Sequence, residues 1–206
     1  MKPHRIAPGV SLYGKSVYEA DHPTMALSVL KEKRGEKFFG IIREIVKRKG
    51  FPGVPGFVDR SILSIVESHD ALHWKKLREL KIRRIKTIIE KYHPKHAFFI
   101  GLEDPDIWID DSNMIHVYFT IAYKLTKKLG YITYLGHAQG ENLYNLKATR
   151  PILPEKHSLF ATFSAFKEAS ISPLDFPSGK INLAEAFYRD AKSPYPEGRM
   201  VIIAAR

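Results

Sequence analysis

The chain has 206 residues, of which 44% are apolar and 27% are charged, so it is long enough to bury a sizeable core and has the composition of a globular protein rather than a disordered or fibrous one. It contains no cysteine, which excludes disulfides, thiolate metal sites and cysteine nucleophiles. No apolar run reaches the roughly 20 residues that cross a bilayer, and no signal-peptide stretch follows the start. We therefore expect one cytoplasmic domain that makes no contact with a membrane.

The net charge of +11 is the one outlier in the composition. Such an excess suits a nucleic acid, a membrane surface or a phosphorylated substrate, or it is simply a solvated basic surface. Lysine and arginine are spread over most of the chain, which favours the solvated surface. We rank nucleic acid last among the partners because no recognition motif accompanies the charge or the basic stretch 75–95.

The first 50 residues are hard to assign, since segment 37–48 (KFFGIIREIVKR) has apolar residues at both helical and extended spacings. Segment 51–56 (FPGVPG) predicts a turn or loop because it holds two prolines and two glycines. Segment 61–67 (SILSIVE) predicts a β-strand, and a hairpin with Trp74 on its second arm could follow. From Trp74 to Tyr92 the local pattern favours a basic amphipathic helix instead.

After residue 97 the strand signals become regular. Segments 107–109 and 115–123 flank a polar turn and predict a hairpin, and segment 131–135 begins the next one. We expect further strands at 160–163, 169–172, 181–188 and 200–204. Aromatic and turn residues recur on a scale of roughly 40 to 50 residues, the length of one propeller blade. The sequence thus predicts one all-β domain over 1–206, of the β-propeller type.

The final segment 199–206 (RMVIIAAR) predicts a strand with no turn after it. An apolar edge strand invites pairing with another strand. We therefore expect an incomplete propeller of about three to four blades, whose C-terminal blades are missing or are supplied by another chain.

Three carboxylates crowd into four residues in the segment Gly101-Leu102-Glu103-Asp104-Pro105-Asp106. Adjacent carboxylates resist joint ionisation, which is how a carboxyl group stays protonated near neutral pH and serves as a general acid. Taken alone, the segment is better explained as a solvated acidic turn before a strand, because structural charge clusters also perturb pKa values. Its neighbours along the chain favour the functional interpretation.

Several segments in the same order resemble glycoside hydrolase family 130. They are 67–74 (ESHDALHW), 101–105 (GLEDP), 117–123 (VYFTIAY), 135–146 (LGHAQGENLYNL) and 166–173 (FKEASISP), and the resemblance covers about residues 60–188. It implies a five-bladed propeller that cleaves glycosidic bonds, with Asp104 as the general acid. Asp106 stands where the family has an arginine, which puts phosphorolysis in doubt and makes hydrolysis the stronger expectation.

The same residues also resemble glycoside hydrolase family 43, another family of propeller enzymes. In that pattern Glu168 would be the general acid, Asp104 the carboxylate that orients it, and Asp59 the base. Both interpretations share Asp104. They also share a chemical logic, because glycoside cleavage needs one carboxyl to protonate the leaving oxygen and a second group to supply or activate the nucleophile. The sequence does not choose between them.

We predict a substrate-binding set of five residues beside these carboxylates: Glu103, Asp70, Tyr123, His137 and Lys167. Sugars pack their C–H faces on aromatic rings, which is why Tyr123 is included, whereas Trp74, Trp108 and Tyr118 are expected in the core. Glu103, Asp104 and Lys167 are expected to share one cleft, with Glu168 nearby.

No cofactor and no metal site are expected, because His93 and His96 have poor ligand spacing around a proline. The function that follows is an enzyme cleaving an oligosaccharide, either as a hydrolase or, with inorganic phosphate as a second substrate, as a phosphorylase. The alternatives are a glycan-binding propeller without catalysis and a basic nucleic-acid-binding protein. The sugar, the linkage and the oligomeric state do not follow from the sequence.

Overall fold

The computed structural model describes residues 18, 20–51, 54, 56–126 and 130–151, and the backbone of three later strands. The fold is built almost entirely of β-strands, as the sequence predicts. The described elements are β1 (Thr24–Val29), β2 (Phe38–Lys49), β3 (Val58–Ser68), β4 (Lys75–Glu79), β5 (Ile82–Arg83), α1 (Ile85–Lys91), β6 (Ala97–Ile109), β7 (Ile115–Leu125), β8 (Tyr131–Gly140), β9 (Leu146–Ala148), β10 (Phe163–Phe176), β11 (Gly179–Tyr188) and β12 (Gly198–Ala205).

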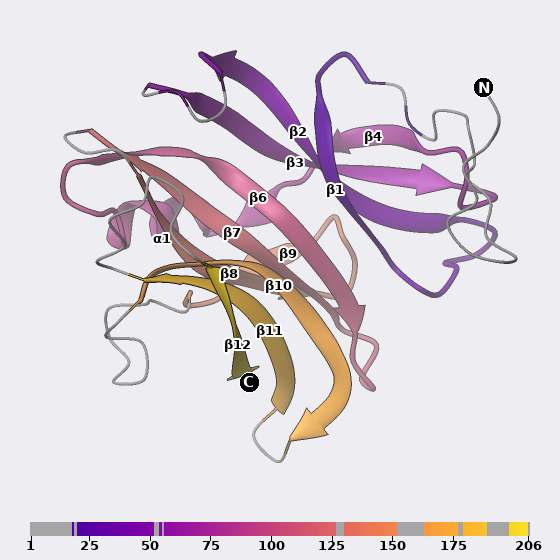
Figure 1. Ribbon diagram of the computed structural model, residues 1–206. Helices are drawn as coiled ribbons and strands as arrows, with labels where there is room; N and C mark the ends of the chain where they lie inside the picture. Colours follow the sequence, from indigo (N-terminus) through magenta and orange to yellow (C-terminus); the bar gives the residue numbers. More distant parts are fainter. Residues whose placement is uncertain are drawn as a thin grey trace, which may run out of the picture.

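The first group of strands contains β1 to β4, paired antiparallel in chain order, and lies at the top of Figure 1. β2 settles the ambiguous segment 37–48 as a strand. Its side chains are buried on both faces from Gly40 to Ile45, which suits a β-branched run between two neighbouring strands. The predicted strand 61–67 lies within β3, and β4 forms the hairpin arm that begins directly after Trp74.

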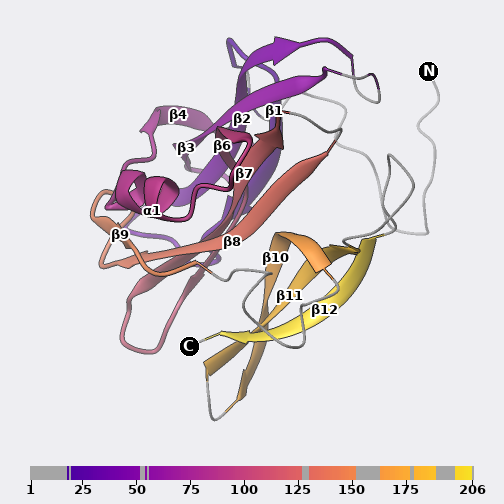
Figure 2. The ribbon, with the colours of Figure 1, turned by 90° about the vertical axis from the view of Figure 1, so that its left-hand side faces the viewer.

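The second group contains β6 to β9, again antiparallel neighbours in chain order. β6 and β7 form the hairpin predicted around 110–113, although β6 starts ten residues earlier than the predicted strand 107–109. Apolar side chains of both groups meet in one core that includes Ile41, Ile65, Phe119 and Tyr123. α1 lies beside β9, on the far side of β8 from β10–β12 (Figure 2).

The segment 74–92 is not the long amphipathic helix that its local pattern favours. It divides into β4, β5 and the seven-residue α1. β4 is extended because it pairs with β3, while β5 pairs parallel with β9. Only the last part of the pattern, which includes Ile85, Ile88 and Ile89, packs as a helix against the core. Non-local strand pairing therefore overrode helical spacing here.

The third group contains β10 to β12, an antiparallel sheet that packs on β6 and β8. β6 thereby contacts β1 on one side and β10 on the other, so one strand of each group meets near the middle of the molecule (Figure 1). Three consecutive antiparallel groups fit the propeller that the sequence predicts. The blade number and the missing blades stay predictions.

The first two groups are joined where β3 and β6 touch at one pair of residues, Ser61 and Gly101, in parallel orientation. Gly101 has a φ of 152°, and a Cβ on it would lie 2.2 Å from the backbone oxygen of Ser61. Only glycine allows the two backbones to come this close. The junction places the acidic segment 103–106 against β2 and β3. Within the described residues, no helix is long and apolar enough to span a membrane.

Candidate functional site

The acidic segment of β6 forms ion pairs with one guanidinium from β2. Arg43 Nη1 donates to Asp104 Oδ1 at 2.8 Å, and Arg43 Nη2 lies 2.8 Å from Glu103 Oε1. The three side chains are only 9 to 12% exposed. Ser61 joins them, since its hydroxyl accepts from Arg43 Nε at 3.0 Å and donates to Glu103 at 3.3 Å. The structure therefore gathers Glu103 and Asp104 around Arg43, while the predicted cleft shared with Lys167 stays a prediction.

The backbone at Asp104 is irregular. Its φ is 47°, a left-handed conformation that is uncommon for a residue other than glycine. The register between β6 and β7 shifts between Glu103 and Asp106, so Asp104 stands in a β-bulge. Bulges and positive φ angles often re-aim a functional side chain. Among the described residues, Asp104 Oδ2 is buried and has no hydrogen-bond partner.

Asp106, at the position of the family's arginine, turns toward β1. Its Oδ1 accepts a hydrogen bond from the Ser28 hydroxyl at 2.9 Å and one from the Ile107 amide at 3.0 Å. The Ser28 hydroxyl oxygen also lies 3.1 Å from the Ile107 amide nitrogen. Asp106 thus ties β6 to β1 and supplies no positive charge to the site.

Asp59 lies near the same junction but in an ion pair of its own. Its two oxygens each accept from Arg48 at 2.7 Å, which is the bidentate geometry of a strong pair. Burial, and then the charges of Glu103 and Asp59, raise the pKa of the Tyr131 phenol. Asp59 and Glu103 are therefore both within electrostatic reach of Tyr131. Its pairing with Arg48 leaves Asp59 poorly suited to act as a free base.

Two predicted substrate-binding residues have other roles in the structure. Asp70 organises a turn: its Oδ1 accepts from the amides of Leu72 and His73, and the His73 imidazole holds its pKa well below the ordinary value. Tyr123 is fully buried in the core, and its hydroxyl donates to the Ile89 carbonyl at 3.0 Å. A sugar has no access to that ring, so we do not carry Tyr123 into the site.

His137 is buried in a polar chain on the second group of strands. Its Nδ1 lies 2.8 Å from the Thr149 hydroxyl, and its Nε2 lies 3.0 Å from His116 Nδ1. His116 Nε2 is in turn 3.1 Å from Asp110 Oδ2, and the Trp108 ring stacks on His116. Although burial opposes it, hydrogen bonds from Ser112 and His116 lower the pKa of Asp110 to about 2.

The Thr149 hydroxyl also donates to the His137 carbonyl at 3.3 Å. The Asp110 carboxylate can only accept, so His116 Nε2 is the donor in the hydrogen bond between them. The His137 side chain serves the fold, and a direct sugar contact stays a prediction.

The buried His137 makes stability depend on pH. Burial, and then the charge of His116, lower the pKa of His137 to about 4, whereas an unfolded histidine titrates near 6.5. Between these values the unfolded chain binds the extra proton, so the free energy of unfolding is expected to fall as pH drops from about 6.5 to about 4. Urea unfolding at pH 7 and pH 5 measures this. His137→Gln should lose most of that slope, while His22→Gln, which changes an exposed histidine, should keep it.

Lys167 and Glu168 lie in β10, the strand that packs on β6. The backbone places Lys167 opposite Glu185 of β11. Their side chains lie outside the described residues, so their approach to Asp104 stays a prediction. The described residues contain no group of three or more metal-ligating side chains.

Arg43 and Ser61, which contact the carboxylates of the site, were not predicted from the sequence. A signal was present, because Arg43 and Glu44 interrupt an apolar run at 41–45. A charged residue inside a buried strand needs a partner. Glu44 is hydrogen-bonded to Lys76 at 2.6 Å and to Ser64, both in the first group of strands, and to Tyr18. Arg43 instead pairs with Glu103 of β6, which lies 60 positions later in the chain.

No protein-family model matches the chain, and no curated protein matches it by sequence. Solved structures match it by fold. One comes from work on the GH130 family of mannoside phosphorylases, which contains glycoside hydrolases that target β-1,2 mannosidic linkages in Candida mannan; it is 16% identical, with a TM-score of 0.54 over 87% of this chain and 49% of that one.

Two further structures give a similar picture. A glycosyl hydrolase from Bacteroides ovatus is 16% identical, with a TM-score of 0.55 over 82% of this chain and 46% of that one. The β-1,2-mannobiose phosphorylase from Listeria innocua, in complex with β-1,2-mannobiose, is 12% identical, with a TM-score of 0.52 over 91% and 57%. The chain spans about half the length of these structures. It therefore shares its fold with structures of glycoside hydrolases and phosphorylases of the family 130 type, as the ordered motifs predict.

Proposed function

We propose that this protein is a carbohydrate-active enzyme that cleaves a glycosidic bond, with Asp104 as the general acid. The observation that carries the proposal is the buried cluster of Glu103, Asp104 and Arg43 at the β-bulge of β6. The fold shared with glycoside hydrolases and phosphorylases supports it.

Charge balance within this cluster suits proton donation. Two carboxylates and one guanidinium carry a net charge of −1, and a proton on one carboxyl makes the buried group neutral. An uncompensated charge is costly away from water. Asp104 Oδ2 is the oxygen that can carry this proton, since it has no partner among the described residues while Oδ1 is held by Arg43.

In the proposed reaction, which requires the buried Asp104 Oδ2 to become accessible to substrate, Asp104 passes its proton to the glycosidic oxygen. The C1–O bond breaks with its electron pair going to that oxygen. Water then adds to C1 and gives a proton to a second carboxylate. Glu168 is the stronger candidate for that base, because Asp59 is held on both oxygens by Arg48. Phosphorolysis would replace the water with inorganic phosphate, and it lacks the cation that Asp106 displaces.

Substitution of Asp104 tests the proposal. Asp104→Asn keeps the shape and the Arg43 contact but removes the acidic proton, so cleavage is expected to fall about 100-fold or more. The assay is product release from manno- and arabino-oligosaccharides, with and without phosphate. Asp111→Asn removes an exposed carboxylate seven residues later and should leave the rate within about twofold. Equal rates for the two variants on an oligosaccharide that the parent protein cleaves would reject the assignment.

A second candidate is a glycan-binding protein without catalysis. It is favoured by the tight pairing of both Glu103 and Asp104 with Arg43, which could serve structure alone. Calorimetric binding of an oligosaccharide that is never cleaved would support this alternative. Cleavage that disappears in Asp104→Asn would end it.

A further inference from the structure

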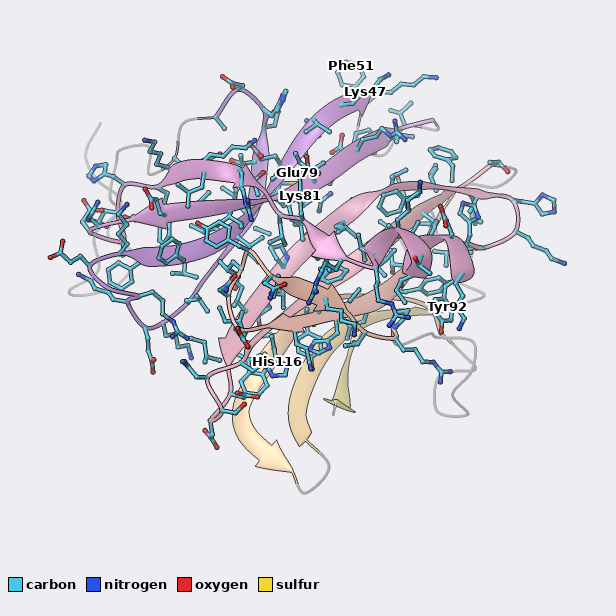
Figure 3. The ribbon with its side chains drawn as sticks, turned by 180° about the vertical axis from the view of Figure 1, so that it is seen from behind. Lys47, Phe51, Glu79, Lys81, Tyr92 and His116 are labelled. Carbon is cyan, nitrogen blue, oxygen red and sulfur yellow. The ribbon has the colours of Figure 1, made fainter. Side chains whose placement is uncertain are left out.

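A basic cleft opens between the end of the β2–β3 hairpin and the β6–β7 pair. Its volume is about 450 Å³, and the residues that line it include Lys47, Lys49, Arg60, Phe98, Lys124 and Leu125. Lys47 and the neighbouring Phe51 lie at the end of this hairpin, on the opposite side of the molecule from His116 (Figure 3). Lys124 and Phe98 are register partners on β7 and β6, so the two strand pairs supply opposite walls.

The cations of the basic cleft are not neutralised. None of Lys47, Lys49, Arg60 and Lys124 forms an ion pair with a carboxylate that the structure describes. The carboxylates of the adjoining junction pair with other cations, since Arg48 pairs with Asp59 and Arg43 pairs with Glu103. Lys47 and Arg60 are also direct register partners across β2 and β3, and like charges in that arrangement repel.

Lys124 is the most informative of the four. Its side chain is 8% exposed, and its ammonium lies 4.2 Å from the centre of the Tyr131 ring, a cation–π contact that holds it in place without an acid. Burial lowers its pKa from the ordinary value. A buried ammonium with no carboxylate beside it is costly, and an incoming anion would remove that cost.

We propose that the basic cleft binds the acidic groups of an oligosaccharide, so that the glycan recognised by this protein carries carboxylates or sulfates. The proposal rests on the carbohydrate-directed function argued above and adds the substrate class to it. Three exposed cations at the rim would pair with the acidic groups, and Lys124 would pair with one that enters the cleft. Phe98 and Leu125 add an apolar wall against which the C–H face of a sugar ring can pack.

The size of the basic cleft favours a short glycan over a nucleic acid. A volume of about 450 Å³ lies in the range of sites for small ligands. Nucleic-acid backbones are bound along extended basic surfaces that follow many phosphates. Here the unpaired cations border one compact opening instead.

Calorimetry on the full chain at low salt tests the proposal, with three probes. Trigalacturonate carries three carboxylates, its methyl ester has the same rings without charge, and single-stranded hexathymidylate carries phosphates. We expect trigalacturonate to bind at least tenfold more tightly than both other probes. Lys47→Gln combined with Arg60→Gln should weaken it at least tenfold, whereas the matched pair Lys31→Gln and Lys95→Gln, exposed elsewhere, should change it less than twofold.

The outcomes separate this inference from the catalytic proposal. A parent protein that binds trigalacturonate but cleaves no oligosaccharide counts against the catalytic proposal and leaves this inference standing. Equal binding of the ester, equal weakening in the control pair, or no binding of trigalacturonate overturns the inference. Tighter binding of hexathymidylate overturns it in favour of nucleic acid. Because Lys47→Gln and Arg60→Gln relieve a repulsion, the free energy of unfolding should not decrease, which guards against misfolding as the cause.

Discussion

Replacing Arg43 by methionine is expected to lower the free energy of unfolding by about 3 to 5 kcal/mol. The side chain is 9% exposed and neutralises Glu103 and Asp104, which are each 12% exposed. Methionine fills much of the same volume, so the loss measures the charges and hydrogen bonds rather than a cavity. The substitution would leave two adjacent buried carboxylates without a cation. The Ser61 hydroxyl would also lose the Arg43 donor that lies 3.0 Å from it.

Urea unfolding of two further variants identifies the cause. Adding Glu103→Gln and Asp104→Asn to Arg43→Met removes the stranded charges and should restore a large part of the loss. Lys37→Met removes a cation that is 37% exposed and pairs with Glu67, so it should cost less than about 1 kcal/mol. If Arg43→Met cost no more than Lys37→Met, the cluster would not be an electrostatic unit, and the charge-balance argument for Asp104 would fail with it.

Gly101→Ala is expected to be destabilising by roughly 2 to 5 kcal/mol. The added methyl would lie 2.2 Å from the Ser61 oxygen and 2.7 Å from its nitrogen, both backbone atoms. Backbone cannot step aside as a flexible side chain does, so β3 and β6 must separate at the one position where their backbones pair, Ser61 with Gly101. Separation would also pull Glu103 and Asp104 away from Arg43 on β2.

The matched control for Gly101 is Gly35→Ala. Gly35 also has a positive φ, 66°, but a Cβ there meets nothing within 4 Å. Its substitution tests backbone strain without a clash and should cost only about 1 kcal/mol. Thermal or urea unfolding compares the two, and oligosaccharide cleavage should fall in the Gly101 variant alone. Similar losses for both would show that φ alone, and not the contact of β3 with β6, makes glycine necessary.

The candidate site and the basic cleft are linked through Tyr131. Its ring supports the Lys124 ammonium, its hydroxyl donates to the Phe57 carbonyl at 3.1 Å, and its pKa responds to Glu103 and Asp59. An acidic glycan bound near Lys124 would therefore lie on the side of the junction where these carboxylates gather.

Local sequence patterns were sufficient for some of the strands, hairpins and site residues. The hairpin of β6 and β7, the strand β3 and the acidic segment around Asp104 were all predictable, because alternating β-branched residues and polar turns carry their own signal. The order of the motifs also predicted the fold shared with the family 130 structures. The same local signals were wrong for 74–92, where β4 follows β3 rather than its own helical spacing.

The sequence by itself determined a basic, cysteine-free, all-β chain with a crowded acidic segment at 103–106. Only the tertiary structure decided which cations meet which acids. Arg43 reaches Asp104 across 61 positions, while Lys47 and Arg60 form no ion pair with any carboxylate in the described part of the chain. Burial likewise removed Tyr123 from the site. The physical reason is that ion pairs and burial depend on contacts between distant strands, which only the register and the crossing of β3 and β6 specify.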